Sequence, residues 1–406
     1  MNLSPKISSH NFYAFLWHAG FLALAQSFID VDTVVPAMII ESGGGAMHIG
    51  IMTAIMLGGS SFTQLFFAPY ISNKPFKKNF LLAGINIRVF SLFALGIILF
   101  YLKGNQSSLA LWFIFLFIIM FSLAGAFSNI SYTDILGKSM NEDRRKSFFS
   151  AKQVIAGGIV LISALLAKKV LTSFEYPVNF AVMFFTGASL LLIATGGFWN
   201  VKEQNPSKKK ISGLRNYLRI LRSELKINPR LGYFLGFINT QGIIISFLPF
   251  VMLYAKETLN TESNDTGNYL IFKVIGIMIV SLMVFLVAKK IKYNLLLYLN
   301  LLFSIMLIIS VMLIDDEYTL RYIFIMGGVV FSLYTITMNG LLLEVSETGN
   351  RAIYTGFAGA GNILPALLPL TGGLLIGNFG FRSFFILYIL IVSLSFYFIR
   401  KIDCRK

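Results

Sequence analysis

The stretch QSFIDVDTVVP, from Gln26 to Pro36, places two carboxylates inside a long run of apolar residues. The run extends over about residues 12–40, and ~20 apolar residues are enough to cross a bilayer. A carboxylate at the bilayer centre costs on the order of 2.5–3.5 kcal/mol on insertion scales, so it normally faces a partner or a water-filled cavity. We therefore interpret Asp30 and Asp32 as part of a solute pathway.

The composition places the chain among membrane proteins with many spans. Of its 406 residues, 56% are hydrophobic and only 13% are charged, and long apolar runs recur along the whole length. We assign the net charge of +16 to membrane topology rather than to nucleic-acid binding. The single cysteine, Cys404, leaves no disulfide framework and no cysteine metal cluster. The first residues lack the pattern of a cleaved signal peptide.

Twelve segments are long and apolar enough to be membrane-spanning helices, which predicts an all-α membrane protein. A lipid-exposed backbone must satisfy its own hydrogen bonds, so each span is expected to be helical. The predicted spans are 12–40, 46–71, 79–102, 108–137, 148–172, 178–199, 231–256, 267–289, 293–314, 320–345, 351–378 and 381–400.

Lysine and arginine gather in alternate loops, which predicts the topology. The largest basic block is KKKISGLRNYLRILRSELKINPR, residues 208–230, whereas the acidic triplet DDE at 315–317 falls in a loop of the other set. Both termini are therefore predicted to lie in the cytoplasm, with the chain in the cytoplasmic (inner) membrane.

The basic block divides the chain into two bundles. We predict an N-terminal six-helix bundle at 1–199, a cytoplasmic linker at 200–230 and a C-terminal six-helix bundle at 231–406. Apolar residues at helical spacing between Ile211 and Ile227 indicate a basic amphipathic helix on the membrane surface. Regulation by lipid is one interpretation of this helix, and we favour the other, a linker that helps to enforce topology.

The two bundles resemble each other in their polar residues. A shift of 213 positions brings the opening stretch onto span 7, so that Pro36 meets Pro249, although Asp30 meets Ile243. A shift of 210 brings span 4 onto span 10. The second shift pairs Asn129 with Asn339 and Asp134 with Glu344, and an arginine follows in each half, Arg145 and Arg351. Two repeats in the same orientation predict bundles related by an axis along the membrane normal, with a solute site between them.

The loop between spans 2 and 3 and the junction after span 4 resemble the major facilitator superfamily. The loop reads PYISNKPFKK, residues 69–78, and keeps the basic residues of that family's signature, although Asn73 stands where an aspartate is usual. The junction TDILGKSMNEDRRKSFFSAKQ, residues 133–153, is similar to that of many prokaryotic members. The resemblance implies that spans 1, 4, 7 and 10 line a central cavity.

On span 1, a polar stripe recurs at helical spacing and is expected to face that cavity. Asp30 is interpreted as a site for a proton, a sodium ion or a cationic group of the solute; a structural ion pair with Arg88 and an end cap near the outer interface are the alternatives. For Asp32, which points away from the stripe, we favour a structural role. The members of the stripe are His18, Leu22, Gln26, Asp30 and Thr33.

Amides on the other lining spans suit a neutral or amphipathic organic solute. The alternative is that these amides hold the bundle together by hydrogen bonds between helices. We favour an interface anchor over a proton relay for His18, and neutralisation of Asp30 for Arg88. Lys273 is expected to snorkel to the surface. The predicted lining residues are Asn129, Asn239, Thr240, Gln241, Tyr334 and Asn339.

Charged residues at the cytoplasmic ends of the spans predict a gate. Asp134 and Glu344 end spans 4 and 10, and ion pairs with nearby lysines would bias rocking between two states; ordinary solvated charge is the alternative. The predicted gate residues are Lys74, Lys77, Lys78, Asp134, Arg145, Lys289, Lys290, Glu344 and Arg351.

The sequence thus predicts a secondary transporter that works by alternating access. A lysolipid or lipid flippase and a non-transporting membrane sensor are the alternatives. We find no phosphate-binding glycine loop, metal spacing or nucleophile–base arrangement, so no enzyme, cofactor or metal is predicted. The expected partners are a small-molecule solute, a proton or a sodium ion, and membrane lipids, but no nucleic acid, and the chain is expected to be a monomer.

Overall fold

The computed structural model describes residues 3–59, 67, 70–71, 73–102, 108–206, 219, 222–287, 293–345, 358–359 and 361–402. These residues are mostly helical, and no strand occurs among them. The prediction of an all-helical chain is confirmed. The principal helices are α1 (Pro5–Gln26), α2 (Val34–Glu41), α3 (Ala46–Ala54), α5 (Lys78–Leu102), α6 (Ser108–Ser139), α7 (Glu142–Ser173), α8 (Val178–Asn200), α10 (Pro229–Thr240), α11 (Phe247–Leu259), α12 (Asp265–Val287), α13 (Tyr293–Met312), α14 (Glu317–Val345) and α16 (Ile363–Ile402).

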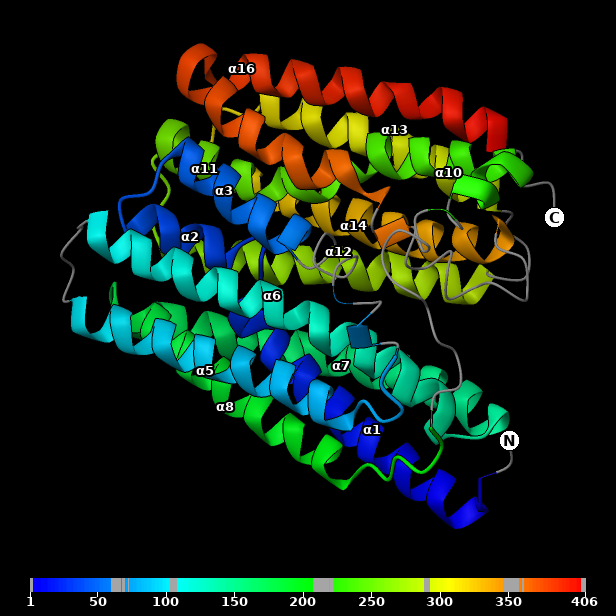
Figure 1. Cartoon of the computed structure of the whole chain (residues 1–406). Coiled ribbons are helices and arrows are strands. Elements are labelled where there is room, and N and C mark those ends of the chain that lie inside the picture. The colour runs from blue at the N-terminus through cyan, green and yellow to red at the C-terminus, as the bar shows by residue number, and fades with distance from the viewer. Residues whose placement is uncertain are drawn as a thin grey trace. The chain divides into compact units, whose positions relative to one another are not determined.

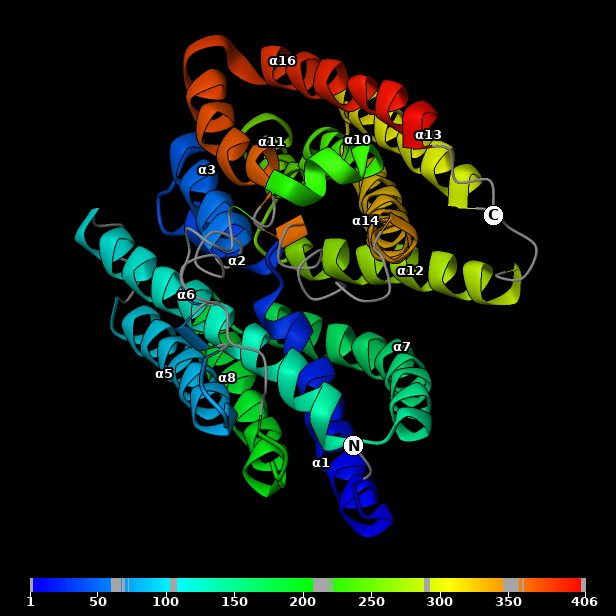
Figure 2. The ribbon, with the colours of Figure 1, turned by 45° about the vertical axis from the view of Figure 1, so that its right-hand side comes forward.

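Within the described residues, nine helical segments are long and apolar enough to cross a membrane. The longest, α16, covers two predicted spans because its chain turns sharply at Gly380, where φ is 75°. Glycine adopts this left-handed conformation without the steric cost of a Cβ. The turn falls between the predicted spans 351–378 and 381–400, and Figure 2 shows the two arms of α16 folded back on each other. The total of twelve spans stays a prediction.

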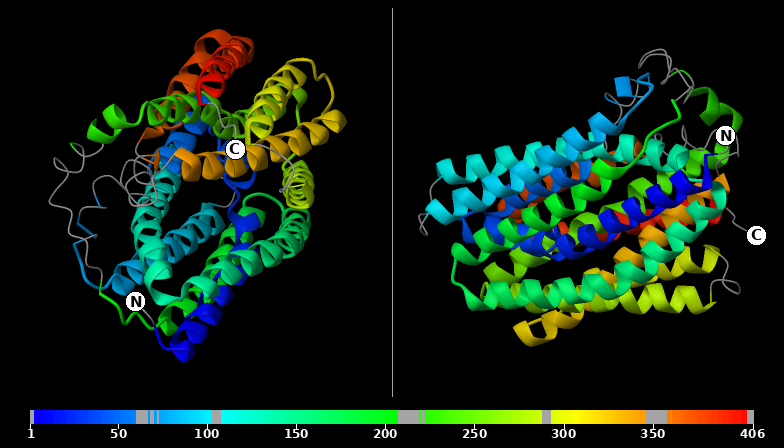
Figure 3. Two further views of the ribbon diagram at one scale, coloured as in Figure 1. Left: turned by 90° about the vertical axis from the view of Figure 1, so that its right-hand side faces the viewer. Right: turned by 90° about the horizontal axis from the view of Figure 1, so that it is seen from below.

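The chain forms two compact units, each described here by itself. The first unit contains residues 1–30 and 62–217. In it, α1 packs against α7 and α8, and α5 packs against α6 and α8 (Figures 1 and 3). Fully buried phenylalanines fill its core, among them Phe15, Phe180 and Phe198.

The second unit contains residues 31–61 and 218–406, so it includes the end of predicted span 1 and the start of span 2. Here α14 packs against α12 and α13, while α16 packs against α10 and α13. Helices α2 and α3 pack against α11, and α3 also packs along α16. Residues 31–61 therefore group by contact with a part of the chain more than 150 residues away, whereas the predicted bundles follow the order of the sequence.

Predicted spans 1 and 7 are both interrupted, at corresponding positions of the repeat. After α1, a 3-10 turn at Ser27–Ile29 leads to α2; after α10, a 3-10 stretch at Gln241–Ser246 leads to α11. Pro36 and Pro249 are each the third residue of the helix that follows. Because a proline ring clashes with the carbonyl four residues earlier, neither helix can continue regularly backward through the break.

Candidate functional site

A buried ion pair joins the break in span 1 to α12. An oxygen of the Asp32 carboxylate lies 2.6 Å from Nζ of Lys273, and the two side chains are only 9% and 5% exposed. The Lys273 ammonium also lies 5.6 Å from the ring centre of Phe331. Asp32 itself is not helical: Asp30 is extended and residues 31–33 form a turn, between the 3-10 turn at Ser27–Ile29 and α2.

A second ion pair and close helix packing surround the first. Nζ of Lys256 in α11 lies 2.9 Å from Glu41, the last residue of α2, and these side chains are more exposed, at 41% and 19%. Helices α3 and α16 approach backbone to backbone: a Cβ on Gly50 would collide with the carbonyl oxygen of Pro369, and one on Gly373 would lie 2.6 Å from that of Ala46. Two ion pairs and a glycine-lined contact thus hold residues 31–61 within the second unit.

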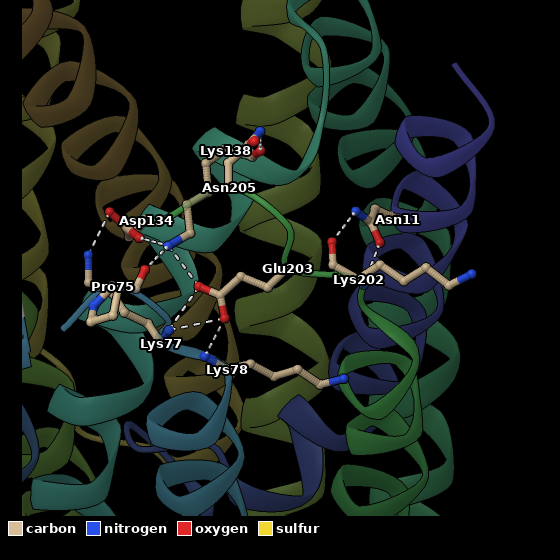
Figure 4. A network of polar contacts seen from close by, with 9 residues as sticks. All are labelled: Asn11, Pro75, Lys77, Lys78, Asp134, Lys138, Lys202, Glu203 and Asn205. Carbon is tan, nitrogen blue, oxygen red and sulfur yellow. Dashed lines mark hydrogen bonds and ion pairs between the residues drawn. The ribbon is translucent and has the colours of Figure 1, made fainter. Parts of the chain in front are cut away.

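The first unit has a charged network where α5 begins and where α6 and α8 end (Figure 4). Lys77 lies 2.8 Å from Asp134, which also lies 2.8 Å from Lys138, one turn further along α6. Lys138 in turn lies 2.7 Å from Glu203, which follows α8. Two cations and two anions alternate in these contacts, which connect the start of α5, the end of α6 and the segment after α8.

Glu203 also caps the start of α5. Its carboxylate accepts hydrogen bonds from the backbone N–H groups of Lys77, at 2.8 and 3.0 Å, and of Lys78, at 2.8 Å. An acidic side chain at a helix N-terminus satisfies unpaired N–H groups and opposes the positive end of the helix dipole. Burial lowers the pKa of Lys77 from its ordinary value, and the hydrogen bond to Asp134 opposes that shift.

Several predicted lining residues are used for packing between helices. His18 is buried, lies 3.2 Å from the carbonyl oxygen of Ala194 and stacks on Phe198. Asn239 donates to the carbonyl of Gly361 at 2.6 Å and accepts from the backbone of Ile363 and Leu364, so it fixes the start of α16.

Three further predicted lining residues are buried in the second unit. Gln241 donates to Ser304 at 2.7 Å and accepts from Ser395 at 2.9 Å. Tyr334 is 2% exposed and stacks on Phe237. Thr240 donates to the carbonyl of Gly236, within its own helix. For these residues the geometry fits the alternative interpretation, hydrogen bonding and packing that hold the bundle together.

Other predicted lining residues remain accessible. Gln26, Asn129 and Asn339 are exposed, and Asp30 is half-buried. Arg88 lies over the ring of Phe121 at 4.1 Å, and its Nε has no hydrogen-bond partner among the described residues.

Most of the sequence matches the model of a known protein family. The family model described as Major Facilitator Superfamily matches residues 16–363. The chain belongs to the Major Facilitator Superfamily. A search of curated proteins gave no match.

Solved structures of transporters share the fold of this Major Facilitator chain. A mutant of the nucleoside transporter NupG superposes with a TM-score of 0.69 at 14% identity, covering 96% of this chain and 98% of that one. A POT family transporter in complex with a thioalcohol-conjugated peptide superposes with a TM-score of 0.67 at 12% identity, covering 97% of this chain and 96% of that one. A bacterial homologue of the human lysosomal transporter Spinster, inward-facing and unoccupied, superposes with a TM-score of 0.62 at 12% identity, covering 99% of this chain and 96% of that one. At these identities the likeness shows the fold; the family makes the chain a membrane transporter with several spans.

Part of the predicted gate of this transporter lies where the structure gives no side-chain description. Lys289, Lys290 and Arg351 fall outside the described residues, and Arg145 and Glu344 lie on described helices whose side chains at these positions are not described. Lys74 is half-buried, with its ammonium 5.0 Å from the ring centre of Tyr70. The contact between Lys77 and Asp134 exists as expected, within one unit, and its role as a gate stays a prediction.

Sequence reasoning missed two partners and misjudged a third residue. Lys138 and Glu203 were not predicted, although the spacing of four between Asp134 and Lys138 was a usable signal for an ion pair on one helix. The prediction that Lys273 snorkels is wrong: it is 4% exposed and pairs with Asp32. Among the described residues, no group of three or more histidine, cysteine or carboxylate side chains has the arrangement of a metal site.

Proposed function

We propose that this transporter is a secondary transporter that moves a small organic or amphipathic solute by alternating access. The proposal includes twelve spans in two six-helix halves, with both termini in the cytoplasm. The buried pair of Asp32 and Lys273 is the observation that carries it. These residues belong to predicted spans 1 and 8, one in each half of the repeat, so their contact is a closed gate on the predicted outer side.

The chemistry of this pair suits a contact that must break and re-form. Two charges out of water lose hydration, and their attraction offsets that loss only while both partners stay together. When the gate opens, water can solvate both groups. Closed and open states can therefore lie close in free energy, as a solute-driven shift between them requires.

Exposed amides on the lining spans support a neutral or amphipathic solute. Asn129 on α6 and Asn339 on α14 are related by the repeat shift of 210 positions, and both are exposed, as are the nearby hydroxyls of Thr133 and Thr335. Polar groups that orient a solute, set among apolar helices, are typical of small-molecule sites. Gln26, the last residue of α1 before the break in span 1, is also exposed and adds a third amide.

For the inner gate, the charged network of Figure 4 would provide the contacts on the N-terminal bundle. We propose that it keeps the loop before α5 fixed through Glu203, and that Glu344 and Arg351, with Lys289 and Lys290, provide the second-half counterpart.

Coupling to a proton through Asp30 is part of the proposal, because this carboxylate is half-buried in the break of span 1. We expect Asp30→Asn to abolish gradient-driven accumulation while sparing solute exchange across proteoliposomes. Unchanged pH-dependent uptake by the variant would contradict the coupling role and leave the gate untouched.

The gate itself is tested by cross-linking the second, more accessible ion pair, that of Glu41 and Lys256. A thermal-shift screen of purified protein across metabolites, drugs and pH first supplies a solute. Glu41→Cys and Lys256→Cys are then combined in a Cys404→Ser background and bridged with a short bifunctional thiol reagent. We expect solute flux in proteoliposomes to be lost when the double variant is bridged, and kept in each single-cysteine variant after the same treatment. Undiminished flux through fully bridged protein would refute the gate.

A further inference from the structure

A groove of about 400 Å³ runs along the first unit between the start of α1 and the end of α8. Its walls include two aromatic side chains that are themselves largely exposed, Tyr13 at 63% and Trp17 at 51%. The volume lies within the ~300–1,000 Å³ typical of small-molecule sites. The remaining lining residues are His10, Ala14, Ile193, Gly196, Gly197 and Asn200.

Two glycines of α8 create the groove. A Cβ on Gly197 would collide with the carbonyl oxygen of Ala14, so this glycine lets the two helices approach closely. At Gly196 a Cβ would meet only Nε1 of Trp17, at 3.9 Å, so the floor beside it is open. Trp17 is fixed as a wall because its Nε1 donates to the carbonyl of Ile193 at 2.9 Å.

The end of the groove is basic. Lys6 and His10 precede Tyr13 and Trp17 at spacings of four, three and four, which places all of them on one face of α1. Lys202 is exposed just past α8, and Figure 4 shows its side chain extending away from the carboxylate of Glu203.

Nearby charges strengthen this basic end. Lys78 donates to the carbonyls of Trp199 and Val201 at 2.6 and 2.9 Å, beside the end of α8. The carboxylate of Glu203 is engaged by Lys138 and by two backbone N–H groups, so it does not neutralise Lys202.

We propose that this groove binds one anionic phospholipid. The phosphate would lie at Lys6 and Lys202, next to His10, whose Nε2 lies 2.9 Å from the carbonyl oxygen of Asn200, and an acyl chain would follow the aromatic walls over Gly196. Cations next to an apolar slot complement this amphiphile in charge and in shape. An ordinary interfacial aromatic belt also places tryptophan and tyrosine at this depth, but it provides neither a slot nor a preference for anionic lipid. The site is separate from the solute pathway, so it does not depend on the proposed transport mechanism.

The test uses the three tryptophans of the chain as reporters. One variant keeps only Trp17, and another keeps only Trp112, which is 71% exposed on α6. Each full-length variant is placed in bilayers with phosphatidylglycerol or phosphatidylcholine that carry the same brominated acyl chains at equal mole fraction. We expect phosphatidylglycerol to quench Trp17 at least twofold more strongly than phosphatidylcholine, and the two lipids to quench Trp112 equally. Equal quenching of Trp17 by both lipids would overturn the proposal.

Substitutions then locate the site. Gly196→Leu, made in the Trp17-only variant, fills the slot and should abolish the excess quenching by phosphatidylglycerol. The control is Gly232→Leu, at an exposed glycine of α10 with open space beside it, and it should leave the excess quenching unchanged. Lys6→Gln with Lys202→Gln should reduce phosphatidylglycerol to the level of phosphatidylcholine, and Lys226→Gln, at another exposed lysine, should not. If Gly196→Leu fails to fold, the variant that combines Lys6→Gln with Lys202→Gln is the deciding test. Stronger quenching by phosphatidylglycerol than by phosphatidylcholine in that variant refutes the site.

Discussion

The interruptions in spans 1 and 7 share a bend but not a chemistry. Both consist of an α-helix, a 3-10 segment and a second α-helix with proline as its third residue. In span 1 the break carries Asp30 and Asp32, and the repeat shift of 213 pairs these positions with Ile243 and Ile245. The bend therefore recurs at both positions that the predicted repeat pairs, whereas the two carboxylates occur in span 1 alone.

The partners of the two breaks differ accordingly. In span 7, Gln241 bonds to Ser304 and Ser395, residues of neighbouring helices in the same half of the repeat. In span 1, Asp32 pairs with Lys273, which lies in predicted span 8 and in the same compact unit. A neutral network fixes the local shape, whereas the proposed gate requires the charge pair to separate when water enters. The comparison predicts that substitutions at the two breaks affect different measurements.

The largest effect is expected from removing one partner of the buried ion pair. Lys273→Met removes the ammonium that lies 2.6 Å from the Asp32 carboxylate, and breaking a buried pair costs about 3–5 kcal/mol. Opening the proposed gate would relieve this cost by hydrating the carboxylate. A cysteine at Val34, which is fully buried in α2, should then react with a membrane-impermeant maleimide at least a hundredfold faster than in the parent with Val34→Cys and Cys404→Ser.

The matched control removes both charges. Asp32→Asn combined with Lys273→Met removes both charges of this pair, and replacing a whole buried pair is often close to neutral. We expect the labelling rate of Val34→Cys to return to within tenfold of the parent. If Lys273→Met alone leaves the rate unchanged, the pair does not hold the gate, and the contrast between the two breaks fails.

The positions of the bends are marked in the sequence more directly than the partners are, for a physical reason. Proline geometry is local, and Pro36 and Pro249 each stand just after a break. Ion pairing is not local: nothing near Lys273 in the sequence shows that Asp32 lies beside it. The same limit explains Glu203, whose partners Lys77 and Lys138 are distant in the chain. Asn239 and Gln241 were correctly recognised as polar residues within a span, but composition alone could not tell a lining amide from one bonded between helices.

A smaller effect is expected at the span 7 break. Gln241→Leu removes three buried hydrogen bonds, of which the one to the carbonyl of Asn300 is long at 3.5 Å, and this should lower the free energy of unfolding by about 1–3 kcal/mol. The labelling rate of Val34→Cys should stay within threefold of the parent, since the bonds lie inside one half. Gln26→Leu is the matched control: the same substitution at an exposed glutamine should change stability by no more than about 0.5 kcal/mol. A strong increase in labelling by Gln241→Leu would show that the two breaks act together.

The smallest effect is expected at the outer, more exposed ion pair. Lys256→Gln should lower the free energy of unfolding by only about 0.2–1 kcal/mol, because the lysine side chain is 41% exposed and water already screens the pair. This difference between parent and variant should vanish in 1 M salt, where the Debye length falls to about 3 Å. The hundredfold labelling effect of Lys273→Met should persist in the same salt, because ions do not reach a pair buried against Phe331. Equal salt sensitivity at both pairs would mean that water reaches Asp32 in the closed state, and the break in span 1 would then lose the property that sets it apart from the break in span 7.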